Sequence, residues 1–201
     1  MAEKLTIEIF HKKQPEELTI ALSEADSRTD IGSGAALTAA AAASYLKRAA
    51  ALTVEAGETN ERAEYIHHNS EILRGYMVHL IDEDVKSRGP LRKAIKENDP
   101  QVIEAARQPA AQVANEIVNM MNQLLELDEE LCAFAAPEAK RFCAAAADLA
   151  MGGIQATMRY LFHQAGKCSD ETYRYVVKRE NEITLDACRA IYARILEKTA
   201  E

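Results

Sequence analysis

Three consecutive acidic residues near the middle of the chain carry the side chains best suited to acid–base chemistry. Asp82, Glu83 and Asp84 follow Leu80 and Ile81 in a segment whose apolar residues recur with the spacing of a helix. Because successive helical residues point about 100° apart, at least one acid must lie near the apolar side. A carboxyl group held against an apolar seam has a raised pKa, which suits a general acid or base. The alternative is a solvated acidic face without a chemical role.

A further carboxylate, Asp148, is the only charged residue between Arg141 and Arg159. Burying a lone carboxylate in a helix of small residues is costly unless it has a partner or a task. Asp148 is therefore a candidate for a functional or interface role. Gly152 and Gly153 follow it, and two glycines inside a helix cost about 1–2 kcal/mol relative to alanines. They indicate close approach of another backbone or a ligand, or close helix packing alone.

A glycine–serine–glycine sequence, residues 32–34, opens the most alanine-rich part of the chain. Alanine has the highest helix propensity, so residues 33–56 are predicted to form one helix with little side-chain bulk. Its free N-terminal N–H groups and the helix dipole favour an anion there. The alternative is that the glycines only make a tight turn and Ser33 only caps the helix. Residues 33–56 and 144–157 predict close packing, some of it against a second subunit in a homodimer.

The four cysteines show no pattern of a metal site. Cys132, Cys143, Cys168 and Cys188 form no CxxC pair, and only His163 stands at a loose metal-ligand spacing from one of them. We therefore expect buried or partly buried free thiols of a reduced cytoplasm, with a metal or disulfide role as the alternative.

Prolines, glycines and capping residues divide the chain into helices with short connections. The expected helices span residues 16–25, 33–56, 60–88, a short basic stretch from 90, 100–127, 137–164 and 169–198, with Asp99 and Ser169 as N-caps. Pro109 should kink or split its helix. Residues 5–10 alternate apolar and polar and predict a short strand or an extended arm. Because the connections are short, consecutive helices should be antiparallel neighbours.

The composition indicates one all-helical domain. The chain has 201 residues, 48% of them hydrophobic, with five prolines, eight glycines and no tryptophan. Its net charge of −8 argues against a nucleic-acid binder or a protein held to an anionic membrane. No apolar run has the length of a membrane span, and the first residues do not resemble a secretory signal. A basic run is interpreted as a solvated surface, although it could receive carboxylates: Arg88, Arg92, Lys93, Lys96 and Arg107.

Three segments, in order, resemble the cyclodeaminase fold group. This group contains the cyclodeaminase part of formiminotransferase-cyclodeaminase and bacterial methenyltetrahydrofolate cyclohydrolases. The resemblance lies in GSGAALTAAAAASYLKRAAALT, similar to the family's glycine-rich turn and small-residue helix, and in LIDEDVKSR, similar to its acidic helix motif. DLAMGGIQA is similar to a third family helix, with Asp148 in the place of the family's aspartate. Pro109 falls where the family has a proline, and the acidic motif is the most specific feature.

The resemblance implies a fold, a function and a set of site residues. The fold is an all-α antiparallel bundle of the cyclodeaminase type, with residues 1–201 as a single domain and a homodimer with its site near the subunit interface. The function is that of a cytoplasmic folate one-carbon enzyme, either methenyltetrahydrofolate cyclohydrolase or formiminotetrahydrofolate cyclodeaminase. A tetrahydrofolate derivative is the substrate, without a metal or a permanently bound cofactor. The implied catalytic residues are Asp82, Asp84 and Asp148, and the implied substrate-binding residues are Gly32, Ser33, Gly34 and Glu83.

The chain departs from the family pattern at several polar positions. Asp30 and Ile31 replace two glycines of the turn, and its flanking prolines are missing. Residues 54–58 are acidic where the family is rich in lysine, and residues 143–147 replace asparagines before the later aspartate. The alternative function is therefore a catalytically diverged family member that binds another small molecule or a protein partner.

Overall fold

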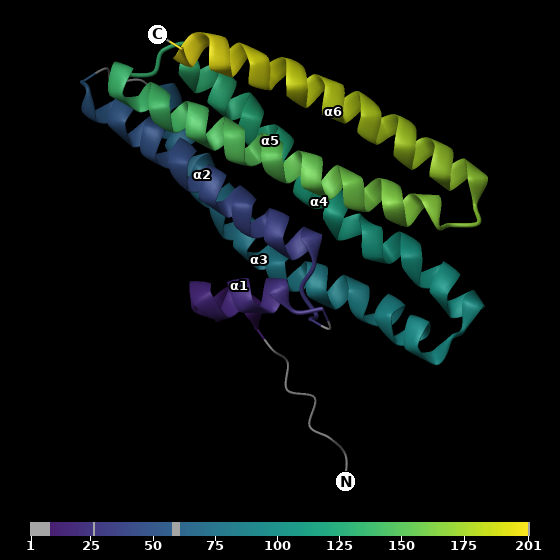
Figure 1. The fold of residues 1–201 in the computed structure, drawn as a ribbon. Helices are drawn as coiled ribbons and strands as arrows, with labels where there is room; N and C mark the ends of the chain where they lie inside the picture. Colours follow the sequence, from purple (N-terminus) through teal and green to yellow (C-terminus); the bar gives the residue numbers. More distant parts are fainter. Residues whose placement is uncertain (1–8, 26, 58–60, 201) are drawn as a thin grey trace.

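The structure is a computed structural model that describes residues 9–25, 27–57 and 61–200. Over these residues the chain forms six α-helices, one short 3-10 helix and no strand (Figure 1). The elements in order are η1 (Phe10–Lys12), α1 (Pro15–Ser23), α2 (Ile31–Glu55), α3 (Glu61–Glu97), α4 (Pro100–Cys132), α5 (Pro137–Gly166) and α6 (Glu171–Thr199). The prediction of an all-α fold is confirmed.

The five long helices lie side by side as a bundle, and the short helix α1 lies outside it (Figure 1). Helix α2 is central, since it packs against α3, α4 and α5, whereas α6 covers α4 and α5 on the side away from α1. From α2 onward, consecutive helices run antiparallel to each other, as the short connections predicted. The Thr29 hydroxyl donates to the Ala21 carbonyl at 2.9 Å and ties α1 to the start of α2.

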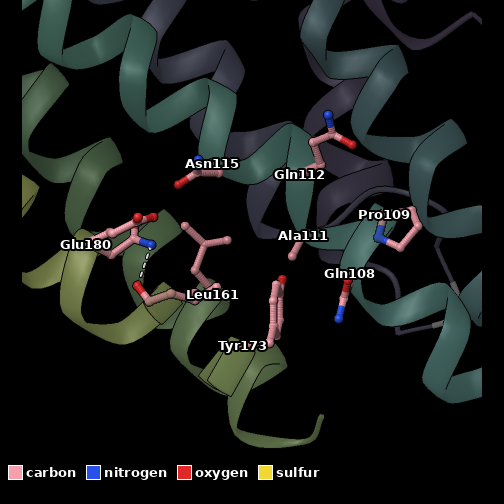
Figure 2. A pocket seen from close by; sticks show the side chains of 10 residues that line it. Gln108, Pro109, Ala111, Gln112, Asn115, Leu161, Tyr173 and Glu180 are labelled. Carbon is pink, nitrogen blue, oxygen red and sulfur yellow. Dashed lines mark hydrogen bonds between the residues drawn. The ribbon is translucent and has the colours of Figure 1, made fainter. Parts of the chain in front are cut away.

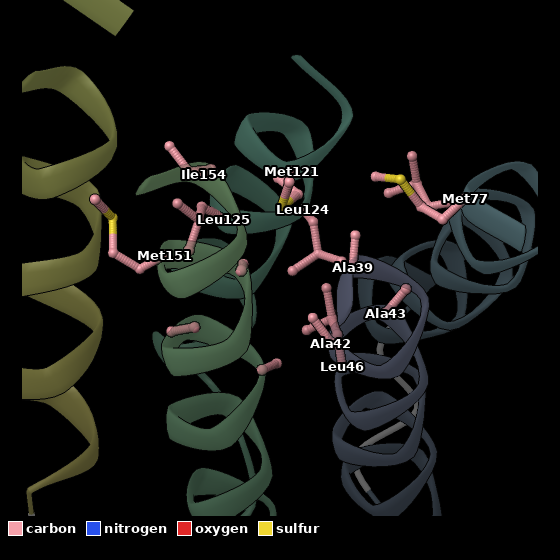
Figure 3. Packing of buried hydrophobic residues seen from close by; sticks show 14 of the residues in the cluster. Ala39, Ala42, Ala43, Leu46, Met77, Met121, Leu124, Leu125, Met151 and Ile154 are labelled. Carbon is pink, nitrogen blue, oxygen red and sulfur yellow. The ribbon is translucent and has the colours of Figure 1, made fainter. Parts of the chain in front are cut away.

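Small side chains on α2 face large ones on its neighbours (Figure 3). Ala39 and Ala43 are fully buried, as are Met77 of α3 and Leu124 of α4. Because alanines add little bulk, the neighbouring helices can approach the backbone of α2 and fill the space with their longer side chains. The predicted close packing of the alanine-rich helix is therefore present within one chain.

The two consecutive glycines of α5 have different surroundings. A methyl group added to Gly153 would lie 2.7 Å from the sulfur of Met121 on α4, so close helix packing explains this glycine. Gly152 is exposed, and an added methyl group would meet no atom within 4 Å. Nothing in the structure explains a glycine at position 152.

Two prolines that were expected to end or split helices lie inside continuous ones. Helix α3 continues through Pro90, so the predicted break at residues 88–90 and the separate basic helix are wrong. Helix α4 continues through Pro109, which excludes a split there. Around these prolines, Leu91 of α3 packs against Ala106 and Ala110 of α4 in a small buried cluster. This packing lies directly after Pro90 and on both sides of Pro109, and it offsets the missing backbone hydrogen bonds.

Apart from the C-terminal end of α3, the ends of the helices lie within about five residues of the predicted ones. Asp99 caps α4 by accepting hydrogen bonds from the backbone N–H groups of Gln101 and Val102, both at 3.1 Å. Asp170, rather than the predicted Ser169, caps α6. Residues 5–8 of the predicted strand or arm lie outside the described residues, and Phe10 begins η1. No helix in the described part of the chain has an apolar stretch long enough to cross a membrane.

Candidate functional site

The three consecutive acids of α3 point in three directions. Asp82 and Asp84 are buried, with 6% and 0% of their surface exposed. Glu83 is partly exposed and forms an ion pair with Lys86 at 2.7 Å and a longer one with His79. The expectation that at least one acid lies on the apolar side is confirmed, and the structure places two of them there.

Asp84 lies between α3 and the first turn of α2. Its Oδ2 accepts a hydrogen bond of 2.6 Å from the Ser33 hydroxyl and lies 3.1 Å from Nη2 of Arg88. Its Oδ1 has no hydrogen-bond partner among the described residues and lies against Gly32. Burial raises the pKa of Asp84, and the Arg88 charge and the Ser33 hydrogen bond only partly oppose it. The site therefore holds a carboxyl group that takes up a proton more readily than an exposed aspartate.

The glycines and Ser33 belong to the helix itself. Helix α2 begins at Ile31, and Asp30 is its N-cap, accepting from the Ile31 N–H at 2.8 Å. The sequence placed Gly32, Ser33 and Gly34 in a turn or at the cap, and the structure corrects this to the first turn of α2. The sequence predicted that an anion would bind at the N-terminus of this helix. In the structure, the Asp84 carboxyl group of the same chain lies there, beside Gly32 and Ser33.

Arg88 connects this buried acid to the helix cap. It is only 5% exposed, forms an ion pair with Asp30, and donates to the backbone carbonyl of Arg28 at 2.9 Å. The interpretation of the basic run as a solvated surface is therefore wrong for Arg88. The reason is its position four residues after Asp84 on α3, which turns its guanidinium toward the same buried face.

His11 contacts Asp82, and sequence reasoning gave no indication of this contact. The ring Nδ1 of His11 is hydrogen-bonded to Asp82 Oδ2, and the His11 backbone N–H donates to Asp82 Oδ1 at 3.3 Å. The two residues are 71 positions apart, so no local spacing could have revealed the pair. A carboxylate that holds Nδ1 leaves Nε2 as the ring atom for exchanging a proton with a substrate.

Tyr160 of α5 is a further residue that the sequence did not single out. It is 5% exposed, and its hydroxyl has no hydrogen-bond partner among the described residues. Burial raises the pKa of Tyr160 to about 12, while the nearby Arg88 lowers it and Asp84 raises it further. The hydroxyl of Tyr160 therefore stays protonated at neutral pH.

A surface hollow of about 490 Å³ lies at the start of α2. Asp30, Gly34, Arg88 and Arg92 line it together with the end of α1 and the loop that follows. Two arginines and a carboxylate in one hollow can bind a ligand that carries both negative and positive charge. Of the predicted residues, Gly32, Ser33, Gly34 and Asp84 lie together at the start of α2, and Gly34 lines the hollow, whereas Asp82 contacts His11.

Asp148 lies elsewhere in the single chain. It is exposed on α5, and its Oδ1 accepts a hydrogen bond of 2.6 Å from the hydroxyl of Tyr192 on α6. Asp84 faces α2, whereas Asp148 faces α6 on the far side of the bundle. The three aspartates were expected to share one site. Within one chain they do not line one cleft.

A second hollow of about 360 Å³ lies between α4, α5 and α6 (Figure 2). Amide side chains dominate its polar lining, which includes Gln108, Gln112, Asn115 and Asn181 together with Tyr173 and Glu180. It contains none of the site residues predicted from the sequence, and it opens on the side of α5 that faces α6.

Fold and site together define an all-α bundle in which a buried acid of one helix meets the start of an alanine-rich helix. A family model for formiminotransferase-cyclodeaminase matches residues 16–182, and the chain belongs to this family. Among solved structures, the chain is similar to formiminotetrahydrofolate cyclodeaminase from Thermotoga maritima, with a TM-score of 0.88 and 20% sequence identity. That similarity covers 94% of this chain and 96% of the other, and it confirms the predicted fold. No curated protein matches this chain in sequence.

Proposed function

We propose that the protein is a folate one-carbon enzyme that closes a formimino group on tetrahydrofolate to the methenyl form with loss of ammonia. Membership of the formiminotransferase-cyclodeaminase family supports this choice over the related cyclohydrolase reaction, in which water opens the methenyl ring. The observation that carries the proposal is the buried acid Asp84, which Ser33 and Arg88 hold beside the hollow at the start of α2.

The reaction requires proton transfer around a cationic carbon. A folate nitrogen attacks the formimino carbon, and a tetrahedral intermediate forms. The attacking nitrogen then loses a proton, the departing nitrogen gains one, and the bond to ammonia breaks. An acid–base pair can carry out both transfers, and a nearby carboxylate can stabilise the positive charge as it develops.

Some of the residues that fit these roles are partly exposed, and others are buried. His11 and Asp82 form the acid–base pair, because the imidazole side chain is 29% exposed and Asp82 fixes its orientation. Asp84 supplies the negative charge from the buried side. Arg92 and Arg88 at the hollow offer positive charge to a substrate carboxylate, and the first turn of α2 with Gly34 forms its wall.

Two predicted site residues have conditional roles in this proposal. Asp148 would join the site only in an assembly that brings α5 of a second chain next to the start of α2, and the α3–α4 interface proposed below does not include α5. Glu83 can contact substrate only after its ion pair with Lys86 breaks. No metal or permanently bound cofactor is part of the proposed chemistry.

Turnover is tested by mixing the purified protein with formiminotetrahydrofolate and following the methenyl absorbance. We expect absorbance to appear in proportion to protein concentration, with release of one ammonia per methenyl group. His11→Gln should lower the rate by about 10²-fold or more, as expected for loss of a general acid or base. If no rate above buffer is found for this substrate or for methenyltetrahydrofolate, the catalytic proposal fails. A thermal-shift response to another ligand would then identify a diverged binding protein.

We also propose a homodimer in the cytoplasm. The four cysteines of the chain are buried free thiols, as in a reduced compartment. Along α3, the side chains of Tyr65, Ile72 and Tyr76 are 47%, 55% and 38% exposed and line a groove shared with α4. A second copy that covers this groove would remove a row of large apolar groups from water.

We expect light scattering to give about twice the chain mass of 22.2 kDa. Ile72→Glu should give a monomer, because it places a charge in the proposed interface. Ile183→Glu on α6 is a matched control, since Ile183 is also 55% exposed. A monomeric parent protein at micromolar concentration would contradict this proposal, as would a dimer that Ile72→Glu leaves intact.

A further inference from the structure

A second group of reactive side chains lies where α4 ends and α5 begins. Cys132 follows Asp128 by four residues on α4, so both project from one helix face, and Cys143 faces them from α5. One ligand atom from each of the three residues lies within 4.8 Å of the other two. The sulfur of Cys132 is 3.8 Å from Asp128 Oδ1. This Asp128–Cys132–Cys143 cluster belongs to helix ends that the proposed folate site does not use.

Asp128 is the unusual member of the cluster. It is 0% exposed, and its Oδ2 has no hydrogen-bond partner among the described residues. Burial raises its pKa well above the ordinary carboxyl range, and the neighbouring Cys132 raises it further. Buried polar groups are normally satisfied, and an isolated buried carboxyl group destabilises the fold unless something pairs with it. Asp128 Oδ2 is thus left without a hydrogen bond from the described residues, in a buried cluster that also holds two thiols.

We propose that Asp128, Cys132 and Cys143 bind a thiophilic divalent cation of the zinc type. Zinc favours thiolate sulfur at about 2.3 Å and carboxylate oxygen at about 2.0–2.2 Å, so adjacent ligands of a tetrahedral site lie about 3.5 Å apart. The sulfur–oxygen distance of 3.8 Å is close to this value without rearrangement of the helices. Three protein ligands leave a fourth position for water.

Binding is balanced in protons and charge. Each thiol and the carboxyl group releases one proton to solvent as its bond to the ion forms, which leaves the occupied site with one net negative charge. Lys140 of α5 and Lys198 of α6 both act electrostatically on Cys132 and offset this charge. Lys198 is fixed nearby, since its Nζ donates to the Glu129 carbonyl at 3.3 Å.

The ion would cross-link α4 and α5, which pack against each other and are joined by a short connection. Residues 133–136 separate α4 from α5, and the cluster lies across this connection. A bound ion would therefore hold the α4–α5 hairpin closed and stabilise the bundle from the end opposite the α3–α4 connection (Figure 1). The proposed role is structural, and it does not depend on turnover at the folate site.

The test uses the full chain, reduced and freed of metal with a chelator, and titrated with Co²⁺. We expect one Co²⁺ per chain, a thiolate-to-cobalt charge-transfer band in the near ultraviolet and the visible bands of tetrahedral cobalt. Zn²⁺ should abolish these bands and raise the melting temperature as its concentration increases. A folded wild-type chain that shows no charge-transfer band with excess Co²⁺ overturns the proposal. Conversion of Cys132 and Cys143 to a disulfide in place of metal uptake overturns it equally.

Substitutions of single residues test which side chains bind the ion. Asp128→Asn keeps the shape of the side chain but removes the carboxylate, and we expect it to weaken Co²⁺ binding by at least about 100-fold. Cys143→Ser should abolish the charge-transfer band or shift it strongly. Cys168→Ser and Cys188→Ser are matched controls, since both cysteines are buried and lie outside the cluster. A band that persists unchanged in folded Asp128→Asn, or that disappears in the two controls, contradicts the assignment.

Discussion

Asp84→Asn should lower kcat of the proposed ring closure by about 10²–10³-fold, because it removes the buried negative charge that stabilises the cationic transition state. The asparagine carbonyl can still accept the Ser33 hydrogen bond, so the substitution changes charge more than shape. Arg88 keeps its ion pair with Asp30 and its bond to the Arg28 carbonyl. The loss should therefore appear in kcat while the fold remains intact.

Stability should respond in the opposite direction to activity. Burial raises the pKa of Asp84, so the folded chain holds this proton more tightly than the unfolded chain does. The ionised group therefore destabilises the native state above its unfolded pKa, and this loss grows as the pH rises through the raised folded pKa. Asp84→Asn removes that contribution. We expect its melting temperature at neutral pH to equal or exceed that of the parent, with a weaker fall between acidic and neutral pH.

A control substitution removes a different negative charge from α3. It separates the effects of Asp84→Asn from those of charge removal in general. Glu97→Gln alters an exposed acid whose ion pair with Lys93 spans 3.9 Å, and we expect unchanged turnover and a stability change within about 0.5 kcal/mol. Turnover assays and thermal melts from pH 4 to pH 8 provide the comparison. If Asp84→Asn melts well below the parent and retains its turnover, Asp84 is a structural acid.

The acidic motif shows what helical spacing can predict about a site. Three neighbouring positions on a helix diverge, and the structure accordingly turns Asp82 and Asp84 inward and Glu83 outward. The partners of the inward pair come from distant positions. Ser33 lies 51 residues from Asp84 and His11 lies 71 residues from Asp82. Such contacts follow from how helices pack, and a single sequence has no local pattern that encodes them.

The prolines show that tertiary packing can outweigh the tendency of a proline to end a helix. A proline removes one backbone hydrogen bond, and on that basis Pro90 should end its helix. In the folded chain, Leu91 is buried against Ala106 and Ala110 immediately beyond it, and this packing continues α3 to Glu97.

The cysteines show the opposite case, in which the local prediction is correct but the arrangement in space does not follow from it. Burial of free thiols was predicted correctly, but the proximity of Cys143 to Asp128 depends on the register between α4 and α5.

Gly32→Ala should lower both stability and turnover, because the added methyl group would occupy the place of the Asp84 carboxyl group. It would lie 2.1 Å from Asp84 Oδ1 and 2.6 Å from Asp84 Cγ, closer than non-bonded atoms can approach. Asp84 cannot move away freely, since it is fully buried and held by Ser33 and Arg88. Overpacking of this kind typically costs about 1–3 kcal/mol. We expect a melting temperature lower by about 2–10 °C.

Gly34→Ala provides the matched control for stability on the same turn of α2. Its added methyl group would lie 3.6 Å from Leu22, an ordinary contact, and alanine favours helix over glycine by up to about 1 kcal/mol. We therefore expect the melting temperature of Gly34→Ala to equal or exceed that of the parent. In a chain that carries Asp84→Ala, Gly32→Ala should destabilise far less, because the group with which it collides has been removed. An equal loss of stability from Gly32→Ala in both backgrounds would show that the strain does not arise at Asp84, and that Gly32 is not required to position this acid.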